Sequence, residues 1–291
     1  MNIILFLTVV GIVISWVHDI QAAVCELCDC SIPLKINCKN KNLDVIPDGI
    51  PMNTTEIDLS ENIITSIENG SLDGLSFLQT LNLDENRITS IENGSLDGLS
   101  SLRLLYLRGN KITSVENRIL DGLSTLLYLD LADNNISSIG DSPFIELTNL
   151  QVLYIQRNRI TSVENGSLDG LSSLQELHSQ QGRITSVESG SLDGLSSLRK
   201  LITSIENGFG DGLSSVDTLY LRNNRITSIE NGSLDGLSSL QYLYLDGNMI
   251  TSVENGSLDG LSSLENLDIS ENRITSVEKG SLDGLSSLLT L

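Results

Sequence analysis

Four cysteines carry the clearest chemistry in this 291-residue chain, and they lie close together: Cys25, Cys28, Cys30 and Cys38. Their C-x2-C-x-C-x7-C spacing could hold a zinc ion or form two disulfide bonds. The cluster directly follows a predicted signal peptide, and disulfides form in the oxidising compartments to which such peptides lead. We therefore predict two disulfides, although spacing alone does not choose among the three possible pairings.

Residues 1–23 predict the signal peptide. Residues 3–17, "IILFLTVVGIVISWV", form an apolar run, and "QAA" at 21–23 offers small residues for cleavage. The amino-terminal region lacks Lys and Arg, so a retained membrane anchor is the alternative. The run is shorter than the ~20 apolar residues of a spanning helix, and no other segment could cross a bilayer. The sequence thus predicts a secreted, extracellular protein.

Catalysis is not predicted. Beyond the signal peptide His178 is the only histidine, and a Ser-His-Asp arrangement would have to use it. Repeated rows of carboxylates could gather Ca²⁺, but one carboxylate per repeat is better explained as a solvated acidic face. We predict no enzymatic activity, no cofactor and no metal site.

The formal net charge is −21, from 17 basic and 38 acidic residues. Eighteen of the acids occupy two repeat positions, one Glu and one Asp in each of nine units, so they were copied together with the repeat. The charge argues against a nucleic-acid partner. It identifies no other partner, and the sequence predicts no oligomeric state.

The element that must position any site is a repeat of 24 residues with the frame L-x-x-L-x-L-x-x-N-x-I. Alternating residues before the Asn predict a short strand whose leucines stack inward on neighbouring coils. The Asn amide is expected to satisfy backbone groups of the next coil. The predicted fold is a curved, right-handed α/β-type solenoid with a parallel β-sheet on its concave face and a mostly irregular or short-helical convex side. The repeated asparagines are Asn62, Asn86, Asn110, Asn134, Asn158, Asn224, Asn248 and Asn272.

Half of each repeat, "ITSVENGSLDGLSSL", is copied almost letter for letter, whereas outward positions of the strand half change from unit to unit. All six tyrosines fall at these changing positions. Tyr and Arg are enriched at binding hot spots, although drift at surface positions, with Tyr as a good strand former, is the alternative. The predicted ligand-binding residues are Tyr106, Arg108, Tyr128, Tyr154, Arg157, His178, Tyr220, Arg222, Tyr242 and Tyr244.

The segment "CELCDCSIPLKINCKNKNLDVIPDGIP" at 25–51 resembles the N-terminal cap of extracellular leucine-rich-repeat proteins such as Slit proteins, small leucine-rich proteoglycans and variable lymphocyte receptors. The resemblance implies disulfides Cys25–Cys30 and Cys28–Cys38, a cap at 24–53 and a leucine-rich-repeat solenoid of about ten units at 54–291. It also implies recognition of an extracellular protein or glycan by the concave face, as in an immune-type or signalling receptor ectodomain. The alternative is a structural matrix or adhesion protein of the proteoglycan kind.

The repeat is degenerate at 174–215. Ser179 replaces an inward Leu, Gly182 replaces the Asn, and six residues are missing between Leu201 and Ile202. We expect neighbouring strands to lose backbone partners there, which would split the stack into blocks ending near residue 175 and starting near residue 216. The chain also stops in mid-repeat without the C-terminal cysteine cap of its relatives, so we expect truncation, and a lost anchor would place the protein at the cell surface.

Seven N-x-S/T sequons predict glycosylation. Five share one repeat position, so copying of the repeat, with the Ser serving a turn, is the alternative. All seven lie away from the strands and would leave the concave surface bare. They are Asn53, Asn69, Asn93, Asn135, Asn165, Asn231 and Asn255.

Overall fold

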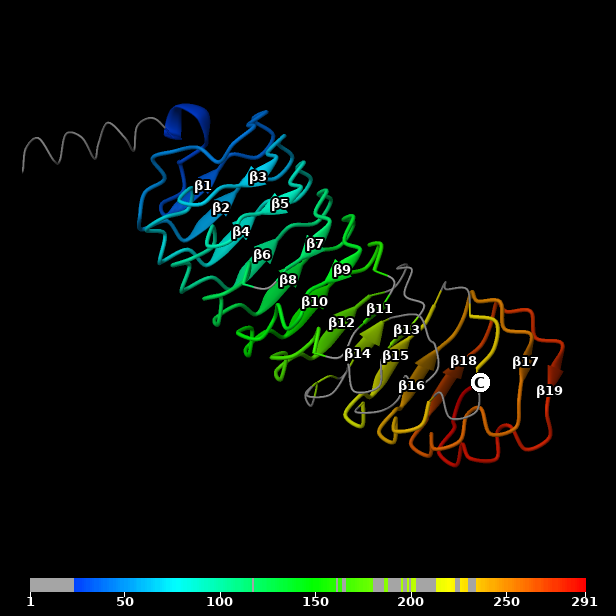
Figure 1. Ribbon diagram of the computed structural model, residues 1–291. Helices are drawn as coiled ribbons and strands as arrows, with labels where there is room; N and C mark the ends of the chain where they lie inside the picture. Colours follow the sequence, from blue (N-terminus) through cyan, green and yellow to red (C-terminus); the bar gives the residue numbers. More distant parts are fainter. Residues whose placement is uncertain are drawn as a thin grey trace, which may run out of the picture.

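A computed structural model describes residues 24–291 except 117, 161, 164–165, 180–185, 188–194, 196–197, 199, 203–212, 223–225 and 230–233. The chain winds into stacked coils, and the main strands lie side by side along one face of an elongated, curved molecule (Figure 1). Helix is confined, in the described part of the chain, to one turn at residues 24–27. The predicted solenoid is confirmed.

The large sheet has eleven strands, all parallel, in the order in which they occur along the chain. Each coil contributes one strand of three residues. The strands are β1 (Lys35–Asn37), β2 (Glu56–Asp58), β4 (Thr80–Asn82), β6 (Leu104–Tyr106), β8 (Tyr128–Asp130), β10 (Val152–Tyr154), β12 (Glu176–His178), β14 (Lys200–Ile202), β15 (Thr218–Tyr220), β16 (Tyr242–Tyr244) and β18 (Asn266–Asp268).

In the ten strands other than β14, whose side chains lie outside the described set, the second side chain is buried and the first and third point to the opposite face. In β4, for example, Leu81 is fully buried between the partly exposed Thr80 and Asn82. Equivalent residues face each other across the sheet, so Leu81 pairs with Leu105 of β6. The strand leucines therefore stack into one continuous core, as expected for units that cannot bury an apolar face alone. We call the outward side chains of these ten strands the sheet face.

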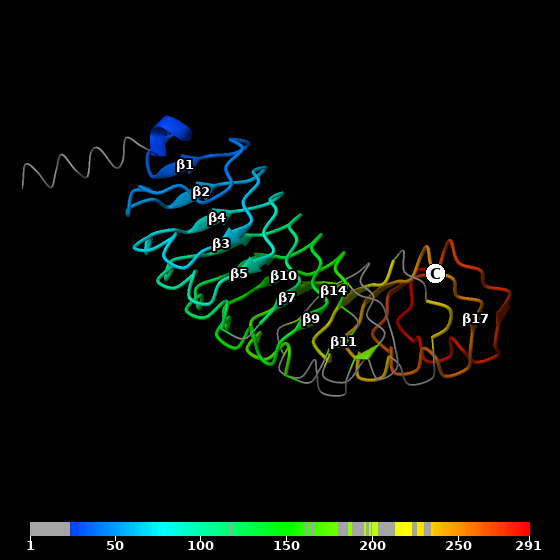
Figure 2. The same cartoon turned by 45° about the horizontal axis from the view of Figure 1, so that its top comes forward.

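The copied half of the repeat builds the other side of the coils (Figure 2). Its leucines, such as Leu96 and Leu99, are buried against those of neighbouring coils. Two-residue strands form four parallel pairs there. They are β3 (Ser66–Ile67) with β5 (Ser90–Ile91), β7 (Ser114–Val115) with β9 (Ser138–Ile139), β11 (Ser162–Val163) with β13 (Ser186–Val187), and β17 (Ser252–Val253) with β19 (Ser276–Val277).

The buried asparagines join neighbouring coils, but to the preceding coil and not to the next one as predicted. Asn86 Nδ2 donates to Leu59 O at 2.9 Å, and Asn86 Oδ1 accepts Ile64 N at 3.1 Å. The reason lies in parallel pairing, where the N–H and C=O of one residue point to the same neighbour. Leu59 N donates to Asn82 O of the following coil, so the Leu59 carbonyl also faces that coil and needs a donor from it.

The sheet continues through the degenerate region, so the expected loss of strand partners is wrong. The residues on either side of the missing six join directly into β14, in which Leu201 pairs with Leu177 of β12 and with Leu219 of β15. The register step from β14 to β15 is therefore 18 residues, from Lys200 to Thr218, instead of 24. Ser179, in the position of an inward Leu, is buried. Gly182 lies outside the described residues.

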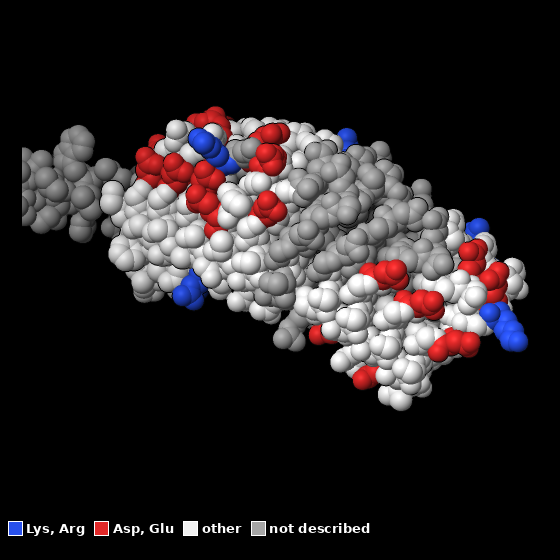
Figure 3. Space-filling model, turned by 60° about the horizontal axis from the view of Figure 1, so that its bottom comes forward, with Lys and Arg blue, Asp and Glu red and all other residues white. Residues whose placement is uncertain are grey.

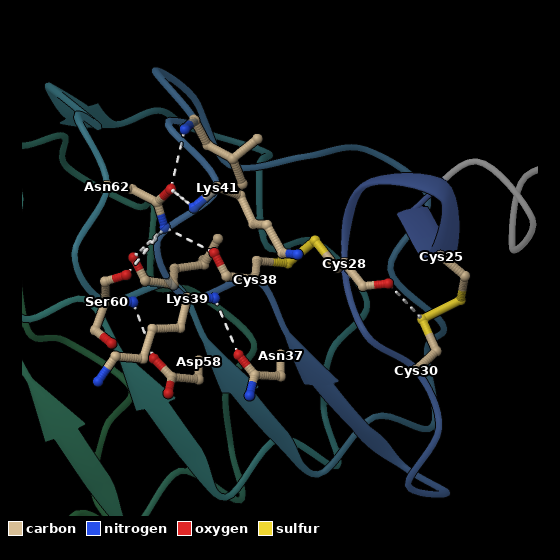
Figure 4. The surroundings of a disulfide bond; sticks show 12 residues. Cys25, Cys28, Cys30, Asn37, Cys38, Lys39, Lys41, Asp58, Ser60 and Asn62 are labelled. Carbon is tan, nitrogen blue, oxygen red and sulfur yellow. Dashed lines mark hydrogen bonds between the residues drawn. A yellow bond between two sulfur atoms is a disulfide. The ribbon is translucent and has the colours of Figure 1, made fainter.

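The N-terminal cap contains both disulfides in the pairing that the resemblance implied (Figure 4). Cys25 bonds to Cys30, and Cys28 bonds to Cys38. The Asn62 side chain ties the cap to the stack, because its Nδ2 donates to Cys38 O at 2.9 Å. At the other end Leu267 N donates to Thr290 O, so the last residues continue the row of strands.

Candidate recognition surface on the sheet

Four aromatic rings form a ladder across β6, β8, β10 and β12. Tyr106 and Tyr128 have ring centroids 5.1 Å apart, and Tyr128 and Tyr154 are 5.4 Å apart, both pairs tilted by about 45°. Tyr154 stacks on His178 at 4.1 Å. The rings zigzag because Tyr128 is the first residue of its strand, whereas the other three are third residues. We call these four residues the aromatic ladder.

A second aromatic group lies on β15 and β16. The rings of Tyr220 and Tyr244 stack at 4.9 Å with only 7° between their planes. The Arg222 guanidinium lies 4.2 Å from the Tyr244 centroid and 5.9 Å from that of Tyr220. Its Nε is 2.7 Å from Asp246 Oδ1, and one of its terminal nitrogens is 3.6 Å from Asp268 Oδ2. The protein thus holds one of its own cations between two rings and two carboxylates.

The remaining predicted residues lie elsewhere. Arg108 and Arg157 both form ion pairs with Asp133 and do not take part in the ladder. Asp133 Oδ2 is 2.9 Å from Arg108 Nε, and Asp133 Oδ1 is 3.4 Å from Arg157 NH1. Tyr242 is exposed and forms no ring contact with another described residue. The ten predicted residues therefore form a ladder, an Arg-capped ring pair, an ion-paired edge and one isolated ring.

Two carboxylates lie next to the ladder, and the sequence prediction missed both. Burial raises the pKa of Asp84 to about 6, a shift that the nearby Asp130 charge increases and the Arg108 amide, which donates to Asp84 Oδ1 at 2.8 Å, opposes. Burial also raises the pKa of Asp130, whose Oδ1 accepts Ala132 N. The sequence did offer a signal for them, because Asp84 and Asp130 occupy outward positions that change from unit to unit.

The same carboxylates act on the ladder tyrosines. Burial, followed by the charges of Asp84 and Asp130, raises the pKa of Tyr106. Burial and Asp130 likewise raise the pKa of Tyr128. Both phenols therefore stay neutral over the physiological range and can donate hydrogen bonds from their hydroxyl groups.

The wider surface is acidic. On the face drawn in Figure 3, acidic side chains gather in groups towards both ends of the molecule, and basic ones are few and scattered. Among the described residues no group of three or more His, Cys, Asp or Glu is arranged to hold a metal ion.

Serines of the copied half have a structural role, because their hydroxyl groups hydrogen-bond within a turn. Ser71 and Ser257 donate through Oγ to the carbonyls of Glu68 and Glu254, each at 2.8 Å. Ser281, which belongs to no sequon, makes the same bond to Glu278 O. A turn therefore accounts for the serines of the Asn69 and Asn255 sequons whether or not a glycan is attached.

Five predicted glycosylation sites can be placed. Asn53, Asn69, Asn93 and Asn255 are exposed and Asn135 is partly exposed, all away from the sheet face. Asn165, Asn231 and the predicted signal peptide lie outside the described residues. In the part of the chain that is described, no helix has the length and apolarity needed to span a bilayer.

Comparison with known families identifies the repeat. The family described as "Leucine rich repeat" matches overlapping segments at 52–112, 77–136, 102–155, 124–181, 148–202, 200–250 and 246–291. The chain belongs to the leucine-rich-repeat family. The matches run without a gap over the degenerate region, in agreement with the continuous sheet of this leucine-rich-repeat protein.

Two solved structures share the fold. A chain of the octameric complex of Latrophilin 3 (Lec, Olf), Unc5D (Ig, Ig2, TSP1) and FLRT2 (LRR) is 27% identical, with a TM-score of 0.76, over 90% of this chain and 81% of the other. An internalin of Listeria monocytogenes is 24% identical, with a TM-score of 0.65, over 88% and 72% of the two chains. The second likeness shows the fold alone.

Two curated relatives match a short segment of the leucine-rich-repeat protein. Immunoglobulin superfamily member 10 of Rattus norvegicus is 41% identical and that of Mus musculus is 37% identical, each over 54 residues, or 19% of this chain. The chain spans only 2% of the length of either relative. The likeness therefore covers only a short segment of each protein.

Proposed function

We propose that this leucine-rich-repeat protein is an extracellular, non-enzymatic recognition protein that binds another protein through its sheet face. The observation that carries the proposal is the aromatic ladder, four rings in contact across four neighbouring strands at positions that packing does not require. Aromatic side chains offer a large contact area at low conformational cost and dominate binding hot spots. Random change of residue type at exposed positions would not be expected to place aromatic side chains in contact on four neighbouring strands.

Two further findings support the proposal. The cap disulfides favour an oxidising, extracellular compartment. The related FLRT2 structure was solved in a complex with other proteins, Latrophilin 3 and Unc5D. By analogy, a protein partner is favoured over the glycan that the sequence left open, and secretion or display at the cell surface follows from the predicted signal peptide.

The test is a binding screen of the secreted chain against an array of extracellular protein domains that includes collagens. Each hit is then retested with a variant in which Tyr106, Tyr128 and Tyr154 are all replaced by Ala. We expect the affinity for a true ligand to fall by about 1–3 kcal/mol per ring, with thermal unfolding nearly unchanged. A control variant replaces three exposed residues of the copied half, Asp73, Asp97 and Asp259, by Ala.

Ligands that bind both variants equally would contradict recognition by the sheet face. Micromolar binding to collagen that ignores the three tyrosines would instead favour the structural matrix function.

A further inference from the structure

The ring pair on β15 and β16 shows how this surface holds a cation. Arg222 lies two residues after Tyr220, and its guanidinium reaches over the Tyr244 ring of the following coil. Asp246 and Asp268 supply the carboxylates. A guanidinium on an aromatic face combines cation–π attraction with charge-assisted hydrogen bonds, and its planar shape suits both.

The ladder repeats this arrangement without the cation. Arg108 lies two residues after Tyr106, as Arg222 does after Tyr220. The residue of the following coil that stands beside Tyr106 is Asp130, whereas the residue that stands beside Tyr220 is Tyr244. Arg108 therefore has no ring at the position that Tyr244 takes relative to Arg222, and it forms an ion pair with Asp133. No described Lys or Arg lies over Tyr106 or Tyr128.

The Arg108 charge opposes the rise in the pKa of both carboxylates at this place, but its guanidinium pairs directly with neither of them. Among the described residues, neither Asp84 nor Asp130 forms a salt bridge. Asp130 is only 7% exposed. The two charges act on each other and on both rings, because each appears among the electrostatic neighbours of Tyr106 and of Tyr128. Two partly desolvated like charges beside two rings form a site that a cation would stabilise.

We propose that Tyr106, Tyr128, Asp84 and Asp130 bind the guanidinium of an arginine side chain presented by the protein partner. The proposal rests on the proposed function and adds the chemistry of the ligand: an exposed, arginine-bearing segment. The rings supply the stacking faces and the two carboxylates accept N–H groups, as the rings and carboxylates around Arg222 do within the chain. The net charge of −21 attracts such a segment over a longer range.

The probe for the test is the peptide acetyl-Arg-Gly-Arg-Gly-Arg-amide, titrated at constant ionic strength while tyrosine ring signals are followed by NMR. Matched peptides carry lysine or the neutral arginine isostere citrulline. We expect the arginine peptide to bind several-fold more tightly than the lysine peptide, and the citrulline peptide not to bind measurably. Shifts should centre on Tyr106 and Tyr128.

Three variants locate the site. Asp130→Asn keeps the acceptor for Ala132 N and removes the charge, and Tyr128→Leu removes one ring. Each should weaken arginine-peptide binding by about fivefold or more, because charged hydrogen bonds and cation–π contacts are each worth that much when partly desolvated. Asp97→Asn, an exposed acid of the copied half, makes the same change in net charge and should alter binding less than twofold.

Equal weakening by Asp97→Asn and Asp130→Asn would mean diffuse attraction to an acidic protein and would overturn the proposal. Equal binding of the arginine and citrulline peptides would overturn it as well. If Asp130→Asn unfolds, Tyr128→Phe and Tyr128→Leu decide, since only Tyr128→Phe, which keeps the ring, should bind the arginine peptide within about twofold of the parent chain. A ligand from the array that needs the three tyrosines but tolerates Asp130→Asn would leave recognition standing and refute the guanidinium site alone.

Discussion

Asp133 binds Arg108 through Oδ2 and, on its other oxygen, the guanidinium of Arg157. It thereby holds the Arg108 guanidinium away from the Tyr106 ring. Asp133 has a positive φ of 53°, which Asn tolerates better than most residues. One carboxylate thus engages two of the predicted binding arginines.

Replacing Asp133 by Asn should free Arg108 to turn over Tyr106. The cost in stability should stay below about 1 kcal/mol, because the two arginine side chains are about half exposed and Asp133 is partly exposed. Ring-current shifts of the Arg108 side-chain protons in NMR spectra would report the movement. Unchanged shifts, with loss of the ion pairs, would show that Asp133 does not control the position of Arg108.

Removal of a buried asparagine should be costly. Asn86→Ala leaves the carbonyls of Leu59 and Leu83 and the amide of Ile64 without their side-chain partner. Each buried group left unpaired costs about 1–3 kcal/mol, so we expect a loss of several kcal/mol in urea unfolding. Gln79→Ala, an exposed change in the same coil, is the control and should cost less than about 0.5 kcal/mol.

Stability should rise on mild acidification through Asp84. Its folded-state pKa of about 6 lies above the ordinary 3.8, so the folded protein binds more protons between these values. The contribution of Asp84 is therefore unfavourable above about pH 6 and is relieved as the pH falls towards 4. Because the group is partly exposed, we expect at most about 1 kcal/mol.

The control for this pH effect is Asp84→Asn, which keeps an acceptor for Arg108 N. Urea unfolding at pH 7 and pH 5 should show a smaller gain on acidification in the variant than in the parent chain. An identical gain in both would assign the effect to general relief of the −21 charge.

The melting temperature should rise from low to moderate ionic strength. Like carboxylates recur in nine of the repeat units. Their repulsion is screened by salt with a Debye length of about 30 Å at 0.01 M and about 8 Å at 0.15 M. Some of these acids also have a structural role, since the carboxylates of Glu92 and Glu278 accept hydrogen bonds from the backbone N–H groups of Asn69 and Asn255. A flat or falling trend would mean that the carboxylates already splay apart.

Strand β14 should be as protected from hydrogen exchange as its neighbours. It has a paired strand on each side despite the missing six residues. Native-state exchange should therefore show slow amides in Lys200–Ile202 at a rate close to those of β12 and β15. Fast exchange at β14 between two protected blocks would restore the split stack that the sequence predicted.

The sequence by itself determined the coil, the strands, the inward leucines and the outward positions of all six tyrosines. It could do so because each coil packs only on its neighbours, so a local pattern repeated at a fixed period specifies the whole stack. The disulfide pairing came from the resemblance of the cap and was confirmed.

Only the tertiary structure decided the rest. Which coil each Asn serves depends on the direction of strand carbonyls, and the closure at Leu201 depends on how an 18-residue coil fits between two of its neighbours. The division of the predicted residues into a ladder, an Arg-capped pair and an ion-paired edge depends on which residue stands opposite each ring one coil further on. Tyr220 stands beside Tyr244 and Tyr106 stands beside Asp130, because parallel register places residues 24 positions apart side by side.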